Sequence, residues 1–152
     1  MSKEHVAIEK IKERFGEKVI IETKEFRNEI TLVVAADAIL DVARLLKEEP
    51  TLDYSFLSDI CGVDWPNRSE RFEVVYNIYS IRHNSRLRLK VRVKENEPSL
   101  PSVTPIWPTA NWHEREAFDM FGIEFVGHPD PRRILNPDDF TGFPYRKDFP
   151  IR

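Results

Sequence analysis

The side chains best suited to chemistry gather at positions 112–121, with the sequence WHEREAFDMF. On a helix, Glu116 and Asp119 would share one face because they are three residues apart, as two catalytic carboxylates would. Arg115 precedes Asp119 by four residues, a spacing that allows an ion pair along a helix. A helix with solvated or interfacial ion pairs explains the same pattern, and we favour that interpretation over a catalytic pair.

A small metal-dependent hydrolase is the alternative from another class of protein. Its ligands would be His113, Glu116, His128 and Asp130, if the chain after the helix folds back over it. The HExxH pattern of metalloproteases is not met, because Ala117 stands where the second histidine is required. Spacing alone selects no metal, so this hypothesis stays the minor one.

Cysteine and glycine usage argues against two further kinds of site. Cys61 is the single cysteine, so the chain alone offers neither a CxxC motif nor a cysteine set for an iron–sulfur cluster. The five glycines are too scattered for a GxGxxG turn or a phosphate-binding loop. Cys61 itself lies on an expected strand, and we predict that its side chain is a small buried hydrophobe.

Alternating cations at positions 86–94 raise the possibility of nucleic-acid binding. The net charge of −3 and the absence of RNP-type or KH-type motifs argue against it. We expect no nucleic-acid partner, and interpret this basic strand as a solvated edge or a contact for an acidic protein.

Hydrophobic periodicity predicts a single α+β domain, residues 1–125, that positions these groups. The expected order is αββαβββα with a largely antiparallel sheet. Asp37 and Thr109 stand where helices can be capped, and Gly16 and Gly122 stand where helices end. The expected helices cover positions 5–15, 38–49 and 110–121, and the expected strands cover 18–26, 29–35, 54–63, 71–79 and 86–94.

Near position 126 the periodicity stops, and we expect residues 126–152 to form an extended proline-rich C-terminal strap. Its aromatic side chains are too frequent for a disordered tail and need a surface on which to be buried. Arg132, Arg133 and Arg146 offer planar guanidinium groups that suit carboxylates. The strap therefore docks either on a partner protein or on its own domain.

The stretch from Glu114 to Pro150, EREAFDMFGIEFVGHPDPRRILNPDDFTGFPYRKDFP, closely resembles the signature of the thirty-kilodalton subunit, designated C, of respiratory complex I, the proton-translocating NADH:quinone oxidoreductase. The matching motifs are ERExxDMFGI, GHPD, RRIL, PDD and RKD followed by an aromatic residue and proline. The family usually has leucine at the position of Pro131, and often tryptophan, histidine and leucine near Phe140, Phe143 and Tyr145. These departures leave the assignment to the family intact. They also allow the chain to be a related subunit of a membrane-bound hydrogenase or of another complex-I-like oxidoreductase.

The resemblance implies a structural subunit with no catalytic residue, cofactor or metal of its own. FMN and iron–sulfur clusters would belong to partner subunits. The direct partners would be the large quinone-site subunit, designated D, and the cluster-bearing subunit, designated B. Electron transfer from NADH to quinone and proton transport would belong to the assembly.

The resemblance also implies a location. The longest apolar run, at positions 30–40, is shorter than the roughly 20 residues that cross a bilayer, and we expect no signal peptide. The chain would be peripheral, on the cytoplasmic side of the cell membrane, as part of a membrane complex.

The residues expected to face a partner lie on the last helix and the strap. They are Glu114, Arg115, Glu116, Asp119, Phe121, His128, Arg132, Arg133, Ile134, Leu135, Asp138, Phe140, Tyr145, Arg146, Lys147, Asp148 and Phe149.

Overall fold

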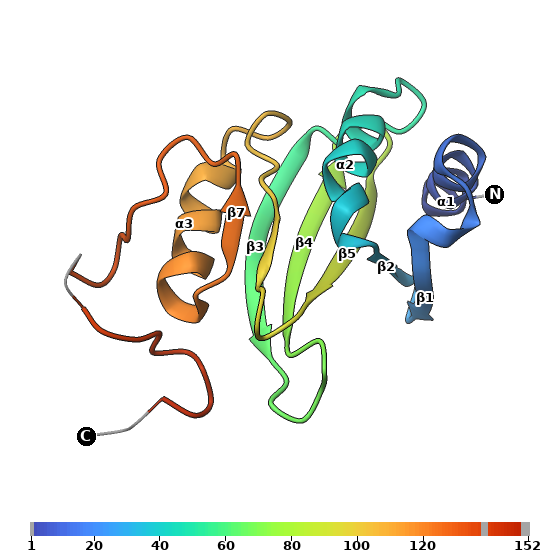
Figure 1. Ribbon diagram of the computed structural model, residues 1–152. Helices are drawn as coiled ribbons and strands as arrows, with labels where there is room; N and C mark the ends of the chain where they lie inside the picture. Colours follow the sequence, from blue (N-terminus) through green and yellow to red (C-terminus); the bar gives the residue numbers. More distant parts are fainter. Residues whose placement is uncertain (1, 138–139, 150–152) are drawn as a thin grey trace.

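Five strands form the main sheet of the computed structural model, which describes residues 2–137 and 140–149 (Figure 1). Their order across the sheet is β1-β2-β5-β4-β3, and only the β2–β5 pair among them is parallel. The predicted α+β class with a largely antiparallel sheet is therefore confirmed. The strands are β1 (Ile20–Phe26), β2 (Glu29–Val34), β3 (Phe56–Asp64), β4 (Phe72–Ser80) and β5 (Ser85–Val93).

Within the described residues, three α-helices pack against one face and one edge of this sheet (Figure 1). α1 (Lys3–Phe15) and α2 (Ile39–Glu48) lie over one face, and α2 contributes a wide apolar side to the core. α3 (Ala110–Phe121) lies beside β3 at the edge of the sheet. The core between the layers is built from aliphatic and aromatic residues of the strands, of the three α-helices and of the loops, because every second strand residue points to that face.

The helix ends test the predicted caps. Gly122 takes a left-handed conformation with φ of 79° and ends α3, as predicted, and Gly16 ends α1. The Asp37 cap was wrong, because Asp37 lies inside the short 3-10 helix Ala36–Ala38 and no side chain caps α2. Thr109 occupies the first position before α3, but its side chain makes no capping hydrogen bond.

A second, two-stranded sheet was not predicted. β6 (Ser99–Pro101) and β7 (Glu124–Val126) pair in parallel on either side of α3 in the sequence. Prolines around positions 98–108 led us to expect no pairing there, but three residues suffice for a ladder when proline lies at its end. This small sheet ties both ends of α3 to the domain.

The position of Cys61 corrects a further prediction, because the residue is exposed rather than buried. Cys61 pairs with Val75 across β3 and β4, on the face of the sheet opposite the α1 and α2 core. Partial burial raises the pKa of its thiol, and the carboxylates of Asp59 and Glu116 raise it further.

Three cations of β5 lie on this same face and pair with carboxylates of β1, β2 and β4. The apolar residues between them are buried, as the period of two predicted. Because the charges pair across the sheet, the strand is not an isolated basic stripe. The pairs are Arg92–Glu22 at 2.9 Å, Lys90–Glu73 at 3.3 Å and Arg88–Glu29 at 3.8 Å.

Candidate partner interface

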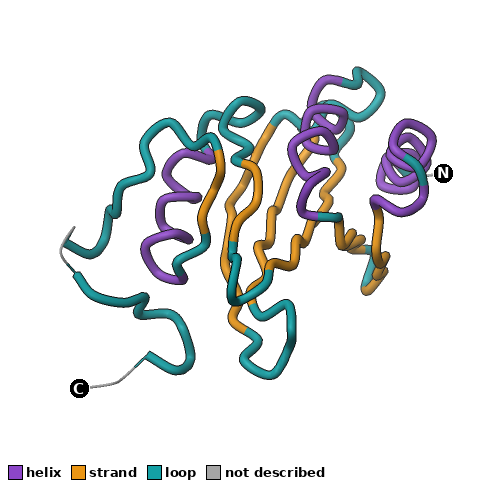
Figure 2. Tube along the Cα trace, viewed as in Figure 1, coloured by secondary structure: helices purple, strands orange, loops and turns teal. Residues whose placement is uncertain are grey.

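Apart from Val126, which ends β7, the strap runs alongside α3 without forming a helix or strand in the part that the structure describes (Figure 2). It approaches a helix that is itself seated closely on β3. A Cβ atom on Gly62 would lie 2.6 Å from the ring of Phe121, so the absence of a side chain there lets α3 reach the sheet. Phe121 in turn meets Tyr145 of the strap edge to face, with ring centroids 5.6 Å apart.

Asp119 is the main anchor of the strap. Its carboxylate is fully buried and accepts five hydrogen bonds from strap residues 133–136. Atom Oδ2 accepts the backbone N–H groups of Ile134, Leu135 and Asn136 at 3.2, 2.7 and 2.9 Å. Atom Oδ1 accepts from Arg133 Nη1 at 2.8 Å and from Asn136 Nδ2 at 2.9 Å. We call these five residues the Asp119 cage.

The cage also fixes the charge of Asp119. Burial by itself raises the pKa of this carboxyl, but the hydrogen bonds from Asn136, Leu135 and Arg133 outweigh it and lower the pKa to about 2. Arg115 is not the partner of Asp119, although the helical spacing suggested it. Arg115 instead donates to the backbone carbonyl groups of Arg132 and Arg133, at 3.0 and 3.3 Å.

A second anchor holds the far end of the strap. Arg71, at the start of β4, is buried and makes a bidentate ion pair with Asp64 at 2.6 and 2.8 Å. Strap residue Asp148 accepts from Arg71 Nη2 at 2.9 Å, and the backbone N–H of Lys147 donates to Asp64 Oδ2 at 2.7 Å. We call these four residues the Arg71 anchor. The hydrogen bond from Arg71 holds the pKa of Asp64 below its ordinary value.

The sequence did not point to Asp64 and Arg71 as site residues. They lie seven positions apart on the two sides of a hairpin, and only the strand register places them together. The available signal was a pair of opposite charges flanking a turn, which is common on protein surfaces and therefore carries little weight.

The strap also completes the C-terminal end of α3. The last carbonyl groups of an α-helix have no partner within the helix. The carbonyl of Met120 accepts from the backbone N–H of Tyr145 at 2.9 Å, and that of Phe121 accepts from Arg146 Nε at 2.7 Å. A cation at this end of a helix is electrostatically favourable. The Arg146 guanidinium also lies between two rings, 4.9 Å from Phe72 and 4.7 Å from Phe143.

Near its start the strap is held by His128. Its Nε2 bonds to the Asn111 carbonyl at 3.0 Å, and its Nδ1 accepts the backbone N–H of Asp130 at 2.9 Å. Both ring nitrogens are thus engaged with the backbone. Among residues 2–137 and 140–149, no three histidine, cysteine, aspartate or glutamate side chains come together as metal ligands would.

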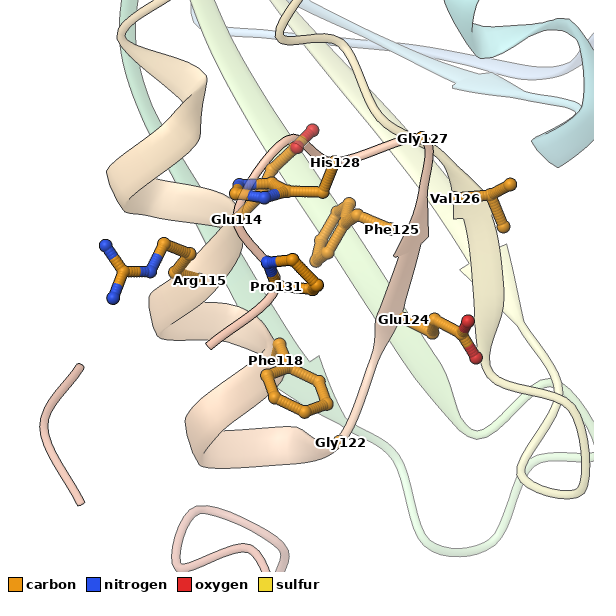
Figure 3. A pocket seen from close by; sticks show the side chains of 10 residues that line it. All are labelled: Glu114, Arg115, Phe118, Gly122, Glu124, Phe125, Val126, Gly127, His128 and Pro131. Atoms are coloured by element: carbon orange, nitrogen blue, oxygen red, sulfur yellow. The ribbon is translucent and has the colours of Figure 1, made fainter. Parts of the chain in front are cut away.

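A hollow of about 390 Å³ lies between α3, β7 and the start of the strap (Figure 3). The rings of Phe118, Phe125 and Pro131 face it, and Arg115 points away from it. Its walls combine apolar and polar side chains, and it opens to the surface beside the strap.

Glu114 is the second fully buried carboxyl of α3. It accepts from Ser102 Oγ at 2.6 Å and from the Val103 backbone N–H at 2.9 Å, and so ties the segment after β6 to the helix. Burial raises the pKa of Glu114 to about 7, although both hydrogen bonds oppose the shift.

This raised pKa predicts a pH dependence of stability. Since the folded-state pKa exceeds the ordinary value of 4.5, Glu114 stabilises the fold most below pH 4.5 and loses that contribution as the pH rises through 7. Glu114→Gln, which stays neutral, should remove this loss, on the order of 2 kcal/mol between pH 5 and pH 8. Thermal unfolding across this range measures it, with the half-buried Glu116→Gln as the control. Parallel pH profiles for Glu114→Gln and the unmodified chain would contradict the prediction.

The structure separates the expected partner-facing residues by exposure. The side chains of Glu114, Asp119 and Phe121 are buried within the chain, and Asp138 lies outside the described residues. The half-buried members are Arg115, Glu116, His128, Arg133, Ile134, Phe140, Arg146 and Phe149, and the exposed members are Arg132, Leu135, Tyr145, Lys147 and Asp148.

Comparison with known proteins places this arrangement in a family. Residues 32–152 match the family model described as respiratory-chain NADH dehydrogenase, 30 Kd subunit. A relative from Roseiflexus sp. (strain RS-1), the NADH-quinone oxidoreductase subunit, designated C, is 52% identical over 87% of this chain and 76% of the relative. The NADH-quinone oxidoreductase subunit of the same designation from Geotalea uraniireducens is 46% identical over the whole chain and 91% of the relative.

Two solved structures share the fold. The trypsin-resistant fragment (1-134) of Nqo5 has a TM-score of 0.63 and 33% identity, covering 82% of this chain and 98% of its own. A chain of the membrane-bound sulfane sulfur reductase, an archaeal respiratory membrane complex, has a TM-score of 0.78 and 28% identity, covering 99% of this chain and 87% of its own. The chain therefore belongs to the family of the 30 kDa subunit of respiratory-chain NADH dehydrogenase.

Proposed function

We propose that this chain is a noncatalytic structural subunit of the hydrophilic arm of a proton-translocating NADH:quinone oxidoreductase. The observation that carries the proposal is the exposed apolar surface of the strap. Arg133 and Arg146 turn inward, to Asp119 and to the end of α3, whereas Leu135 and Tyr145 are 52% and 56% exposed. A strap that is anchored to its own domain but leaves these two apolar side chains at the surface suits burial against another protein.

The partners we propose are the large quinone-site subunit, designated D, and the cluster-bearing subunit, designated B. FMN and iron–sulfur clusters would be held by partner subunits, and the chain would sit at the cytoplasmic side of the cell membrane through the complex. Family membership and the names of the relatives support this assignment. Within the described part of the chain, none of the helices has the length and apolar character needed to cross a membrane.

NADH is the electron donor that the relatives favour. The NADH-quinone oxidoreductase relatives reach 52% identity, whereas the chain of the sulfane sulfur reductase complex reaches 28%. Purification of the tagged chain from gently solubilised native membranes, with identification of co-purifying subunits by mass spectrometry, tests the assignment. A flavin subunit and NADH oxidation support it. A nickel-iron large subunit with hydrogenase activity would replace it with the hydrogenase alternative.

Making the outward side chains acidic should block assembly. Leu135→Asp and Tyr145→Asp each place a charge where we expect an apolar contact, so recovery of NADH:quinone activity with the tagged chain should fall roughly tenfold or more. Thermal unfolding of the isolated chain should change little for Leu135→Asp, because Leu135 is exposed, and only modestly for Tyr145→Asp, which also loses the edge-to-face contact with Phe121. Ile81→Asp is the matched control, since Ile81 is 67% exposed in the β4–β5 turn. Equal recovery for all three variants would refute the proposed interface.

A further inference from the structure

The two anchors of the strap differ in what their release would leave behind on the domain. The side chain of Asp119 is 0% exposed, and its carboxylate depends on strap donors for all five of its hydrogen bonds in the cage. Releasing the cage would therefore strip this carboxylate of five hydrogen bonds at once and leave Arg133 without its counterion.

Release of the Arg71 anchor leaves no such group. The side chain of Asp148 is 68% exposed, so water can replace its contact with Arg71. Arg71 would keep Asp64 at 2.6 Å and Glu95 at 2.8 Å, and Asp64 would lose only the single N–H of Lys147 while keeping Arg71. The domain side of this anchor is complete without the strap.

The remaining polar contacts of residues 140–149 are also of the replaceable kind, and the two ring contacts of this segment with α3, Phe143–Phe118 and Tyr145–Phe121, leave both strap rings partly exposed. No side chain in this segment is fully buried. Tyr145 and Arg146 donate to carbonyl groups at the end of α3, where water can serve as the donor once the strap leaves. Phe140 and Phe149 stack on each other at 6.1 Å, so this contact can move with the strap rather than holding it to the domain.

We propose that the strap is a hinged arm: the Asp119 cage is a lasting pivot, and residues 140–149 dock on the domain and leave it while residues 133–136 stay bound. The hinge motion is a property of the free chain and does not depend on which complex the chain enters. In an assembly, an arm of this kind can be fixed by a partner after the pivot has already positioned it.

Hydrogen–deuterium exchange of the full-length chain, followed by mass spectrometry, tests the hinge. The amides of Ile134, Leu135 and Asn136 report on the pivot, and those of Tyr145 and Lys147 report on the arm, since all five are hydrogen-bonded. After correction for intrinsic rates, we expect the arm amides to exchange at least about tenfold faster than the pivot amides. Equal protection of the two segments, or faster exchange at the pivot, would overturn the proposal.

A matched pair of variants isolates the weak anchor. Asp148→Asn removes a carboxylate of the strap from Arg71, and should speed exchange of the arm amides roughly two- to fivefold without changing the pivot, as expected for an exposed ion pair. Glu95→Gln removes a carboxylate of the domain from the same guanidinium and should leave both segments unchanged. If Asp148→Asn leaves the arm unchanged, or speeds both segments equally, the hinge is wrong.

Discussion

Asp119→Asn is expected to lower the free energy of unfolding by about 3 kcal/mol or more and to free strap residues 133–136 from α3. The asparagine side chain is nearly isosteric, but it is neutral and carries a donor where one carboxylate oxygen now accepts. Three backbone N–H groups converge on Oδ2, so an amide in the reverse orientation would oppose them, and in either orientation Arg133 loses its counterion. The Arg133 side chain is only 11% exposed, so water cannot fully compensate.

Urea-induced unfolding measures this loss, and hydrogen exchange of residues 133–136 shows where it arises. Asp130→Asn is the matched control, because Asp130 also pairs with an arginine of the strap, at 2.6 Å, but is 33% exposed. We expect it to cost less than about 1 kcal/mol. If the two variants lose equal stability, the cage is no more important than a surface ion pair.

Acidification should reproduce the effect of Asp119→Asn in the unmodified chain. The folded-state pKa of Asp119, about 2, lies below its ordinary value of 3.8, so its stabilising contribution is complete above pH 3.8 and is lost as the pH falls through 2. Glu114 has the opposite sign, since its raised pKa favours the fold at low pH. Two carboxyls of one helix thus respond oppositely to pH because the strap supplies charge-stabilising donors to only one of them.

The elements that the sequence predicted correctly are those with a strict local pattern. Along β5, cationic and apolar residues alternate without a break, so both the strand and its buried face could be assigned. The end of α3 could be predicted from Gly122, because glycine readily adopts the left-handed conformation that ends a helix. This signal depends on no contact distant in the sequence. β6 and β7 were missed because three residues with prolines among their neighbours carry no period.

The errors at the site share one physical cause, which is competition from partners distant in the sequence. Helical spacing predicted that Arg115 pairs with Asp119. In the structure, Arg133 and three backbone amides bind the Asp119 carboxylate instead, because they converge on it where it is buried. Sequence alone also left open whether the strap docks on its own domain. Both anchors lie within the chain, yet the exposed Leu135 shows that internal docking does not use all of the strap's apolar surface.

Arg71→Met should be as severe as Asp119→Asn, although Arg71 lies outside the recognisable signature of the family. It leaves the Asp64 carboxylate, whose side chain is 1% exposed, without its bidentate partner, and we expect a loss of about 3–5 kcal/mol measured by urea-induced unfolding. Arg68→Met is the control, because Arg68 is 48% exposed and lies 3.6 Å from its carboxylate partner. It should cost less than about 1 kcal/mol.

A second substitution separates the buried charge from the strap as the cause. Asp64→Leu in the Arg71→Met background removes the stranded carboxylate, so most of the lost stability should return, because an apolar pair can replace a buried ion pair. The Arg71 anchor stays broken in the double variant, so exchange of strap residues 145–149 should remain fast. Recovery of stability without recovery of strap protection would show that the domain folds independently of the arm that it carries. If neither the stability nor the strap protection recovers, Arg71 stabilises the β3–β4 hairpin by packing against Phe72 rather than by its charge.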